Sequence, residues 1–188
     1  MSIEERESAA SDAPSTPPEA ACASSHNSTA TTEAERNCWR TTAAQISSDE
    51  PNIRAAKGFF ASQHCGELDD AFASFVQPDF RFVVSCACND ELRAAIPWAG
   101  YEHKGREGYQ RLTALLYSEY ELLSCETTRF TSAGNQVFVE GHFRLRHRET
   151  ARIADSDFLA RLEMRNGKIA SGQFYENTAA VAAARSAD

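Results

Sequence analysis

Apolar residues recur at helical spacing in the first part of the chain after residue 50 and alternate with polar residues in the second part. The first pattern predicts amphipathic helices, because side chains three or four positions apart share one helix face. The three predicted helices span residues 51–65, 67–76 and 106–118. A strand is expected at 79–85, which is rich in aromatic and β-branched residues. Residues 86–104 show no regular pattern.

The alternating part predicts a four-stranded antiparallel meander. Its strands are expected at about 122–132, 136–148, 152–165 and 168–176. Gly134-Asn135 and Asn166-Gly167 mark two of the turns, since short Asn/Gly pairs favour tight hairpins. Together with the helices, this meander predicts an α+β fold with helices on one side of a curved sheet.

The second hairpin is expected to centre on Thr150-Ala151, because this register separates charged from apolar residues. It places Arg144 opposite Asp157 on one face and Val139 opposite Leu162 on the other. A shift of one residue would mix the two faces. We therefore expect the apolar face to pack under the helices and the charged face to point outward.

The middle of the covered face predicts a pocket. Gly141, Ala160 and Gln173 fall in one row, where two small residues leave room, and Ser171 and Tyr175 share the strand and face of Gln173. Such a pocket is typical of small-molecule sites, which are mostly apolar with a few converging polar groups. The alternative is that helix side chains fill the space and the polar groups are satisfied locally.

Two ionisable residues are candidates for proton transfer. Glu126 falls on the inner face by parity, where apolar surroundings would raise the pKa of its carboxyl group and suit a general base. A bulge in this edge strand would instead turn Glu126 to solvent. His147 shares the inner parity but lies near a hairpin tip, which favours exposure. Trp98 and Tyr101 precede the third helix and are candidates for apolar walls at the open end of the sheet.

Composition and charge narrow the functional classes. The 188 residues carry a net charge of −8, and residues 1–50 hold nine acidic and three basic residues, with Ala, Ser and Thr making up half of this segment. Such a segment predicts a disordered, low-complexity acidic tail before a domain at 51–188. The nearly neutral domain does not favour nucleic-acid binding, and no apolar run is long enough to span a membrane.

The six cysteines predict neither a disulfide framework nor a metal site. Their spacing completes no ligand set, and no secretory leader is visible, so we expect reduced thiols in a cytoplasmic protein. No motif for a cofactor is present, and we expect none.

Five segments together resemble the SnoaL-like branch of the nuclear transport factor 2-like superfamily. They are Gly66-Glu-Leu-Asp between two helices, Asp79-Phe-Arg-Phe, Pro97-Trp-Ala-Gly-Tyr-Glu-His-Lys-Gly-Arg-Glu-Gly, Arg165-Asn-Gly-Lys-Ile and Phe174-Tyr-Glu-Asn-Thr-Ala-Ala-Val-Ala-Ala. Each segment matches the family pattern loosely, but the order of the five segments is fairly specific. The resemblance covers about residues 51–185. It implies a cone-shaped roll of a strongly bent, mostly antiparallel sheet, with three N-terminal helices over the concave face and a homodimer formed through the outer sheet face.

The resemblance also implies candidate functions. Members include polyketide cyclases, ketosteroid isomerase, epoxide hydrolases, dehydratases and non-catalytic binding proteins, so the fold alone does not decide the function. Counting from Gly66 and Gly167 places Phe59, Val84 and Ala160 where the isomerase carries its tyrosine and two aspartates, so that mechanism is not expected here.

Two functions therefore stand as hypotheses. The first is a cofactor-independent enzyme acting on a hydrophobic small molecule by isomerisation, cyclisation or dehydration. Its site would comprise Glu126 or His147 for proton transfer, Gln173 and Tyr175 for orientation, and Trp98, Tyr101, Ser171 and Phe59 around the substrate. The alternative is a non-catalytic binding or dimerisation module. A closed, packed cavity would favour the module, and an open cavity with an ionisable group of shifted pKa would favour the enzyme.

Overall fold

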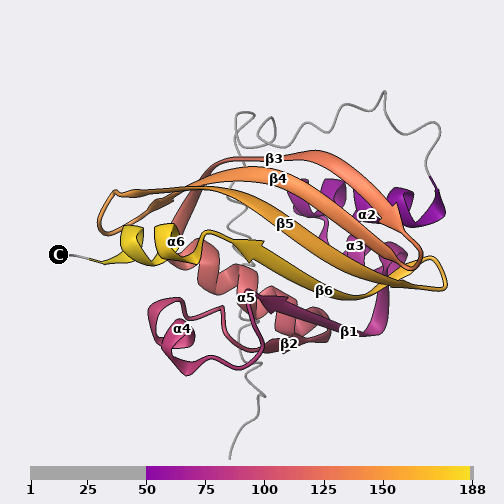
Figure 1. The fold of residues 1–188 in the computed structure, drawn as a ribbon, viewed down its shortest axis with the longest axis horizontal. Coiled ribbons are helices and arrows are strands. Elements are labelled where there is room, and N and C mark those ends of the chain that lie inside the picture. Colours follow the sequence, from indigo (N-terminus) through magenta and orange to yellow (C-terminus); the bar gives the residue numbers. More distant parts are fainter. Residues whose placement is uncertain (1–49, 187–188) are drawn as a thin grey trace, which may run out of the picture. The chain divides into compact units, whose positions relative to one another are not determined.

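A computed structural model describes residues 50–186, so the predicted tail, Glu50 apart, lies outside the described residues. In the described part, one six-stranded sheet has the strand order β2-β1-β6-β5-β4-β3 (Figure 1). The strands are β1 (Val76–Val84), β2 (Glu102–Lys104), β3 (Tyr120–Ala133), β4 (Gln136–His147), β5 (Ile153–Arg165) and β6 (Lys168–Glu176). Strand β1 runs parallel to β6, and all other neighbours are antiparallel. The predicted α+β fold is confirmed.

The helices of the described part are α2 (Pro51–His64), α3 (Leu68–Phe75), α4 (Asp90–Ala95), α5 (Gly105–Glu119) and α6 (Thr178–Arg185). Helices α2, α3 and α5 match the three predicted from the apolar periodicity within two residues. Helix α2 packs against β3, β4 and β6, and α5 packs against β1 and β3. The sheet therefore curls over these helices, as Figure 1 shows.

Helix α4 was not predicted, because it has no apolar stripe. It is six residues long and buries none of them. The Asn89 side chain caps it by accepting a hydrogen bond from the Leu92 N–H at 2.8 Å.

Aromatic rings fill the space between the helices and β1. Phe72 lies 5.5 Å from Phe80, and Phe82 lies 5.1 Å from Tyr109, both in edge-to-face arrangements. Such pairs add about 0.5–1.5 kcal/mol each beyond the area that they bury. This cluster holds α5 against the sheet and fixes the wall of the cavity described below.

The predicted faces of β4 and β5 are confirmed, but their register differs by two residues. Arg144 lies opposite Asp155, and Val139 lies opposite Ala160. The turn is longer than the predicted two-residue loop, because Ala151 adopts a positive φ of 58° and the His147 N–H donates to the Arg152 carbonyl. A shift of two preserves the side-chain alternation, so charged residues still point outward.

One-residue bulges in β3 and β6 change which side chains face inward. In β3 the predicted pairing of Arg129 with Glu140 is confirmed, but the register shifts between Arg129 and Thr127 and again between Ser124 and Leu122. In β6 the predicted pairing of Ile169 with Met164 is confirmed, and the register then shifts before Ser171. Because side chains alternate along a strand, each bulge exchanges the two faces beyond it.

Candidate functional site

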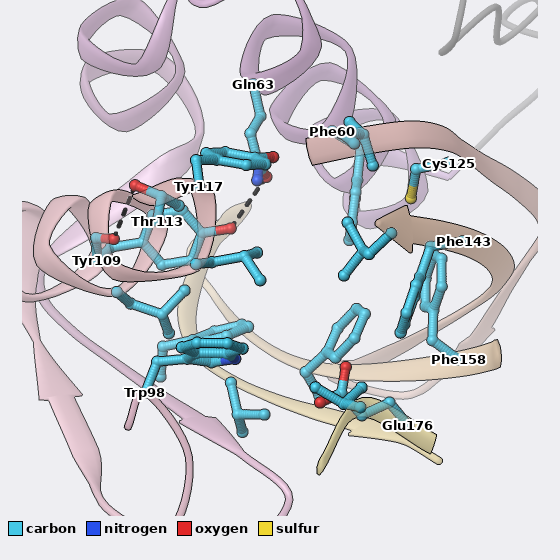
Figure 2. Close-up of a pocket in the computed structure, with 18 of the residues that line it drawn as sticks. Phe60, Gln63, Trp98, Tyr109, Thr113, Tyr117, Cys125, Phe143, Phe158 and Glu176 are labelled. Carbon is cyan, nitrogen blue, oxygen red and sulfur yellow. Dashed lines mark hydrogen bonds between the residues drawn. The ribbon is translucent and has the colours of Figure 1, made fainter. Parts of the chain in front are cut away.

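A cavity of about 100 Å³ lies between the inner face of the sheet and helices α2 and α5 (Figure 2). Its wall is mostly aromatic and aliphatic. Helix α2 contributes Phe59 and Gln63, and α5 contributes Tyr109 and Thr113. Each pair is four residues apart, so both members project from the same helix face. The sheet, the loop before β2 and helix α6 (through Val181) supply the remaining wall.

Glu176 brings a carboxylate into this apolar cavity from the end of β6. The bulge in β6 turns Gly172, Phe174 and Glu176 inward, and Glu176 lies opposite Phe158 of β5. Its Oε1 atom is buried and has no hydrogen-bond partner within residues 50–186. Burial raises the pKa of the Glu176 carboxyl group to about 7, because the ionised form is poorly solvated there.

The residue as a whole is only half-buried, although the carboxylate lies deep in the protein. The two observations agree if the exposed part of Glu176 faces the cavity space. An acid of this kind changes protonation state near neutral pH and is suited to receive and return a proton.

A tyrosine–glutamine pair faces the cavity from the two helices. The Tyr109 hydroxyl donates a hydrogen bond to Gln63 Oε1 at 3.0 Å (Figure 2). Desolvation is the main cause that raises the pKa of Tyr109, so its phenol stays protonated and keeps this donor role. The Thr113 hydroxyl is engaged with its own helix, where it donates to the carbonyls of Tyr109 and Gln110.

No lysine, arginine or histidine is among the described residues that line the cavity. No lining cation is therefore available to stabilise the ionised form of Glu176, in keeping with the raised pKa of its carboxyl group. Within residues 50–186, no group of three His, Cys, Asp or Glu side chains is placed to hold a metal ion.

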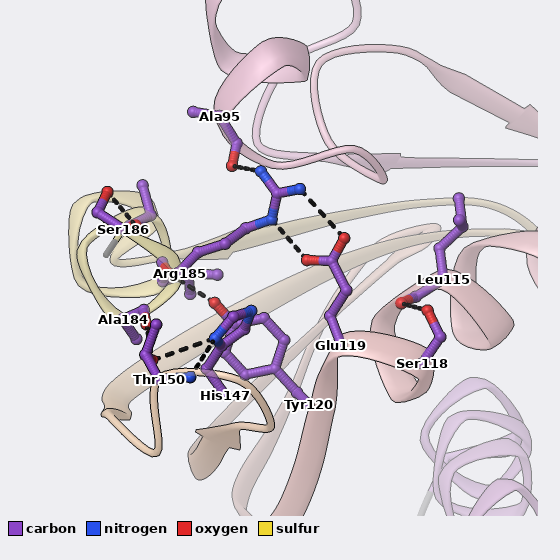
Figure 3. A network of polar contacts seen from close by, with 12 residues as sticks. Ala95, Leu115, Ser118, Glu119, Tyr120, His147, Thr150, Ala184, Arg185 and Ser186 are labelled. Atoms are coloured by element: carbon purple, nitrogen blue, oxygen red, sulfur yellow. Dashed lines mark hydrogen bonds and ion pairs between the residues drawn. The ribbon is translucent and has the colours of Figure 1, made fainter. Parts of the chain in front are cut away.

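Helix α6 covers the cavity next to Glu176 and is tied down by polar contacts (Figure 3). The buried Tyr120 hydroxyl donates to the carbonyl of Val181, a lining residue, at 2.8 Å. The Arg185 guanidinium binds both carboxylate oxygens of Glu119, at 2.5 and 3.2 Å, and donates to the Ala95 carbonyl at 3.1 Å. These contacts fix α6, and with it the strand end that carries Glu176.

Trp98 and Phe59 line the cavity, as the sequence predicted. Both side chains are almost fully buried, and the Trp98 ring lies 5.7 Å from Tyr120, edge to face. Tyr101 does not line it. Its ring lies 4.3 Å from the His103 ring, and the Arg93 guanidinium lies over it at 4.6 Å.

His103 holds the Trp98 segment in place. Its Nε2–H donates to the Trp98 carbonyl at 2.8 Å in a buried site. Desolvation is the main cause that lowers the pKa of His103, so the ring favours its neutral form. This hydrogen bond ties the Trp98 backbone to strand β2.

Neither predicted proton-transfer residue reaches the cavity. Glu126 points outward and is exposed, because the bulge in β3 places Cys125 opposite Phe143 in its stead. The expectation that His147 would be exposed is wrong. His147 is buried at the hairpin tip, 3.1 Å from Thr150 Oγ1, but it lies outside the cavity lining (Figure 3).

The inward placement of Ser171, Gln173 and Tyr175 is wrong, because the bulge in β6 turns all three outward. Gln173 donates to the Ser85 carbonyl at 2.7 Å and accepts from Arg161 at 2.8 Å. Tyr175 is exposed, and none of the three lines the cavity. The space over Gly141 is also filled: a methyl group there would overlap the Phe158 ring.

Sequence reasoning missed Glu176 and Gln63. A signal for Glu176 was present, because Ile169 and Phe174 are five positions apart and cannot both face inward on a regular strand. Placing both in the core requires a bulge between them, and this bulge also turns Glu176 inward. No comparable signal distinguished Gln63, which lies in the last turn of helix α2.

Comparisons with known proteins agree with this geometry. A family model described as a SnoaL-like domain matches residues 57–172. The chain is similar to an NTF2-like protein from Burkholderia xenovorans, with a TM-score of 0.61 and 24% identity over 74% of this chain and 98% of that chain. It is similar to TerC, co-crystallised with polyporic acid, with a TM-score of 0.58 and 22% identity over 70% and 95%.

A third similar structure is an NTF2-like protein from Burkholderia thailandensis, with a TM-score of 0.62 and 16% identity over 73% of this chain and 99% of that chain. These likenesses show the fold. A comparison with curated proteins finds no match. No helix among the described residues is long and apolar enough to cross a membrane.

Proposed function

Because the chain belongs to the family of SnoaL-like domains, we propose that it is a cofactor-independent enzyme that moves protons on a hydrophobic small molecule. The reaction class is isomerisation, cyclisation or dehydration. One observation carries the proposal: the Glu176 carboxylate, whose buried Oε1 atom has no hydrogen-bond partner among the described residues, lies in a mostly apolar cavity. The cavity and the raised pKa of its acid favour an enzyme over a non-catalytic module.

Glu176 is the general base and then the general acid. With a pKa of about 7, a sizeable fraction is ionised at neutral pH, and the carboxylate is a stronger base than an exposed glutamate. A substrate that enters the cavity displaces water from around the carboxylate, and the apolar wall of Phe59 and Trp98 holds the reacting carbon beside it. The proton leaves one carbon for the carboxylate and returns to another position.

A two-part experiment tests the role of Glu176. Carbon-13 NMR of glutamate carboxyl groups should show one titration near pH 7 that disappears in Glu176→Gln. The same substitution should reduce proton transfer on an accepted substrate by about 10²- to 10⁴-fold, the range of general-base catalysis.

Glu126→Gln is the matched control, because Glu126 is exposed on the outer side of the same sheet. It should leave turnover unchanged. Normal turnover in Glu176→Gln would remove Glu176 from the reaction and with it the proposed mechanism.

We also propose a homodimer through the outer face of the sheet. Ile153 and Tyr175 are 44% and 38% exposed, large apolar side chains that a partner would cover. Leu159, opposite Tyr175, and Phe138 are half-buried on the same face. Phe174, which the predicted register placed on this face, points inward. Sedimentation at micromolar concentration should give a dimer, and a monomer would contradict this proposal.

The cytoplasm is the proposed compartment. Cys65, Cys86, Cys88 and Cys125 are free thiols, the state that a reducing compartment maintains. Alkylation of these thiols in intact cells, followed by mass spectrometry, tests this assignment. Disulfide-linked cysteines in the cellular protein would contradict it.

A further inference from the structure

We infer that a cleft on the outer face of the sheet binds the phosphate group of a small molecule. The cleft has a volume of about 200 Å³ and lies over strands β2, β1, β6 and β5, which are neighbours in the sheet (Figure 1). None of its lining residues lines the apolar cavity on the inner face. The inference depends on an arginine that contacts no carboxylate, a second arginine across β6, and a serine hydroxyl between them.

The bulge in β6 directs two polar side chains to this cleft. Beyond the bulge, Ser171 and Gln173 point to the outer face. Ser171 lies opposite Arg81 of β1, and Gln173 lies opposite Arg161 of β5. The two arginines therefore stand on either side of β6, with its polar side chains between them. Bulges commonly re-aim side chains toward a site in this way.

Arg161 carries a positive charge that no carboxylate of the described residues balances. Its Nη2–H donates to Gln173 Oε1 at 2.8 Å, and the Gln173 amide donates in turn to the Ser85 carbonyl at 2.7 Å. Within residues 50–186, Arg161 forms no ion pair. On the same sheet face each of three other arginines contacts a carboxylate, namely Arg129, Arg144 and Arg146. A neutral amide thus orients the Arg161 guanidinium, whose charge and remaining N–H groups are left for a ligand.

Arg81 and Ser171 supply the other donors. The half-buried Ser171 hydroxyl has no hydrogen-bond partner in the part of the chain that the structure describes. The Arg81 Nη1 atom lies 3.8 Å from the Glu102 carboxylate, which is too long for a hydrogen bond. The same carboxylate lies 3.5 Å from Lys104. Arg81 can therefore turn to a ligand while Glu102 stays beside Lys104.

The charge and the number of donors select a phosphate group. Arg81 and Arg161 bring two positive charges, and Glu102 is the one carboxylate among the described lining residues. Glu163 of β5 is on the same face but is exposed outside the lining. A phosphate monoester carries a charge of about −1.5 to −2 and three strong acceptor oxygens. One oxygen can face each arginine and the third the Ser171 hydroxyl, whereas a carboxylate has only two oxygens to offer.

The cleft adjoins the proposed dimer surface. Arg161 and Gln173 form the outward-facing pair next to Leu159 and Tyr175 along β5 and β6. A carboxylate of a second copy is therefore the competing occupant. The three donors favour the phosphate group, and the oligomeric state of the variants separates the two occupants.

An NMR titration at pH 7 and constant ionic strength tests the site. The probes are inorganic phosphate and phenyl phosphate, and chloride is the reference anion. In the wild type both phosphates should give saturable shifts of the Arg161 Nε–H and Ser171 backbone N–H signals, whereas chloride should not. Equal affinity for the two probes would assign the cleft to free phosphate, and tighter binding of the ester would assign it to a phosphorylated organic molecule.

Substitutions in the cleft should weaken binding of both probes. Arg161→Gln and Arg81→Gln should each lower the affinity by about 10- to 100-fold, the range of one hydrogen bond to a charged group. Ser171→Asp should abolish binding, because its carboxylate would occupy the arginines, and it removes no hydrogen bond among the described residues. Arg129→Gln is the matched control: it removes the same charge from the same sheet face outside the cleft and should keep the affinity.

Shifts that do not saturate in the wild type, or an affinity unchanged in both Arg161→Gln and Ser171→Asp, would overturn the inference. Sedimentation of the same proteins tests the competing occupant. A wild type that binds no phosphate but becomes monomeric in Arg161→Gln would assign the cleft to a carboxylate of the second copy and reject the phosphate site. Glu176→Gln should bind phosphate normally, because Glu176 lies on the inner face. Failure of the proposed catalytic role therefore leaves this inference standing.

Discussion

Replacing Glu176 with glutamine should stabilise the protein, and by an amount that grows with pH. The carboxyl group has a pKa of 4.5 in a model compound and about 7 in the folded protein, because burial disfavours the ionised form. Between these values the folded state retains a proton that the unfolded state has lost. Wild-type stability therefore falls as pH rises from about 4.5 to 7 and becomes level above 7.

The size of this effect follows from the two pKa values. A shift of one unit corresponds to about 1.4 kcal/mol, so the raised pKa of Glu176 costs the fold about 3 kcal/mol at pH 8 and about 1 kcal/mol at pH 5. The neutral amide of Glu176→Gln carries no such cost. We expect the variant to exceed the wild type in unfolding free energy by about 2 kcal/mol more at pH 8 than at pH 5.

Urea denaturation of both proteins at pH 5 and pH 8 measures the difference. Glu126→Gln is the control, because this exposed glutamate lies on the other side of the same sheet and its replacement should leave the pH dependence of the wild type unchanged. An equal effect of Glu176→Gln at the two pH values would show that the carboxylate is solvated, and the argument for a perturbed acid would fail.

Two further substitutions test the packing around the cavity. Gly141→Ala should destabilise the fold by about 1–3 kcal/mol, because its methyl group would overlap the Phe158 ring and the Glu126 carbonyl oxygen; an unchanged urea midpoint would show that the sheet yields there. Tyr120→Phe should cost about 1 kcal/mol by removing the hydrogen bond to the Val181 carbonyl, and hydrogen exchange should become faster in α6 while the centre of β4 stays protected. Uniform acceleration in both elements would contradict a local role.

Most of the architecture followed from periodicity and turn residues. The three predicted helices and the meander are present because a consistent apolar stripe buries enough surface to decide the local structure. The register next to Gly134 and next to Gly167 was predicted, since both turns are short and Gly takes a positive φ in each. The charged residues of β4 and β5 face outward as predicted, although the observed register differs from the predicted one by two residues.

The site was predicted less well, because it depends on single-residue irregularities. The bulge in β3 was weighed as an alternative for Glu126, and it occurs. The bulge in β6 was not predicted. It turns Gln173 outward and Glu176 inward. Gln63 was missed for another reason: its role comes from a contact with Tyr109, 46 positions away, which periodicity along either helix does not contain.

The bulge in β6 divides one strand into two register frames. Ile169 lies opposite Met164 and Ser171 lies opposite Glu163, so Ala170 is the residue left out of the ladder. Deleting Ala170 would restore regular pleating and keep Glu176 opposite Phe158, whereas pairing Ala170 with Glu163 would bring Tyr175 to that position. Whether one alanine joins the ladder therefore decides if the cavity receives a carboxylic acid or a phenol.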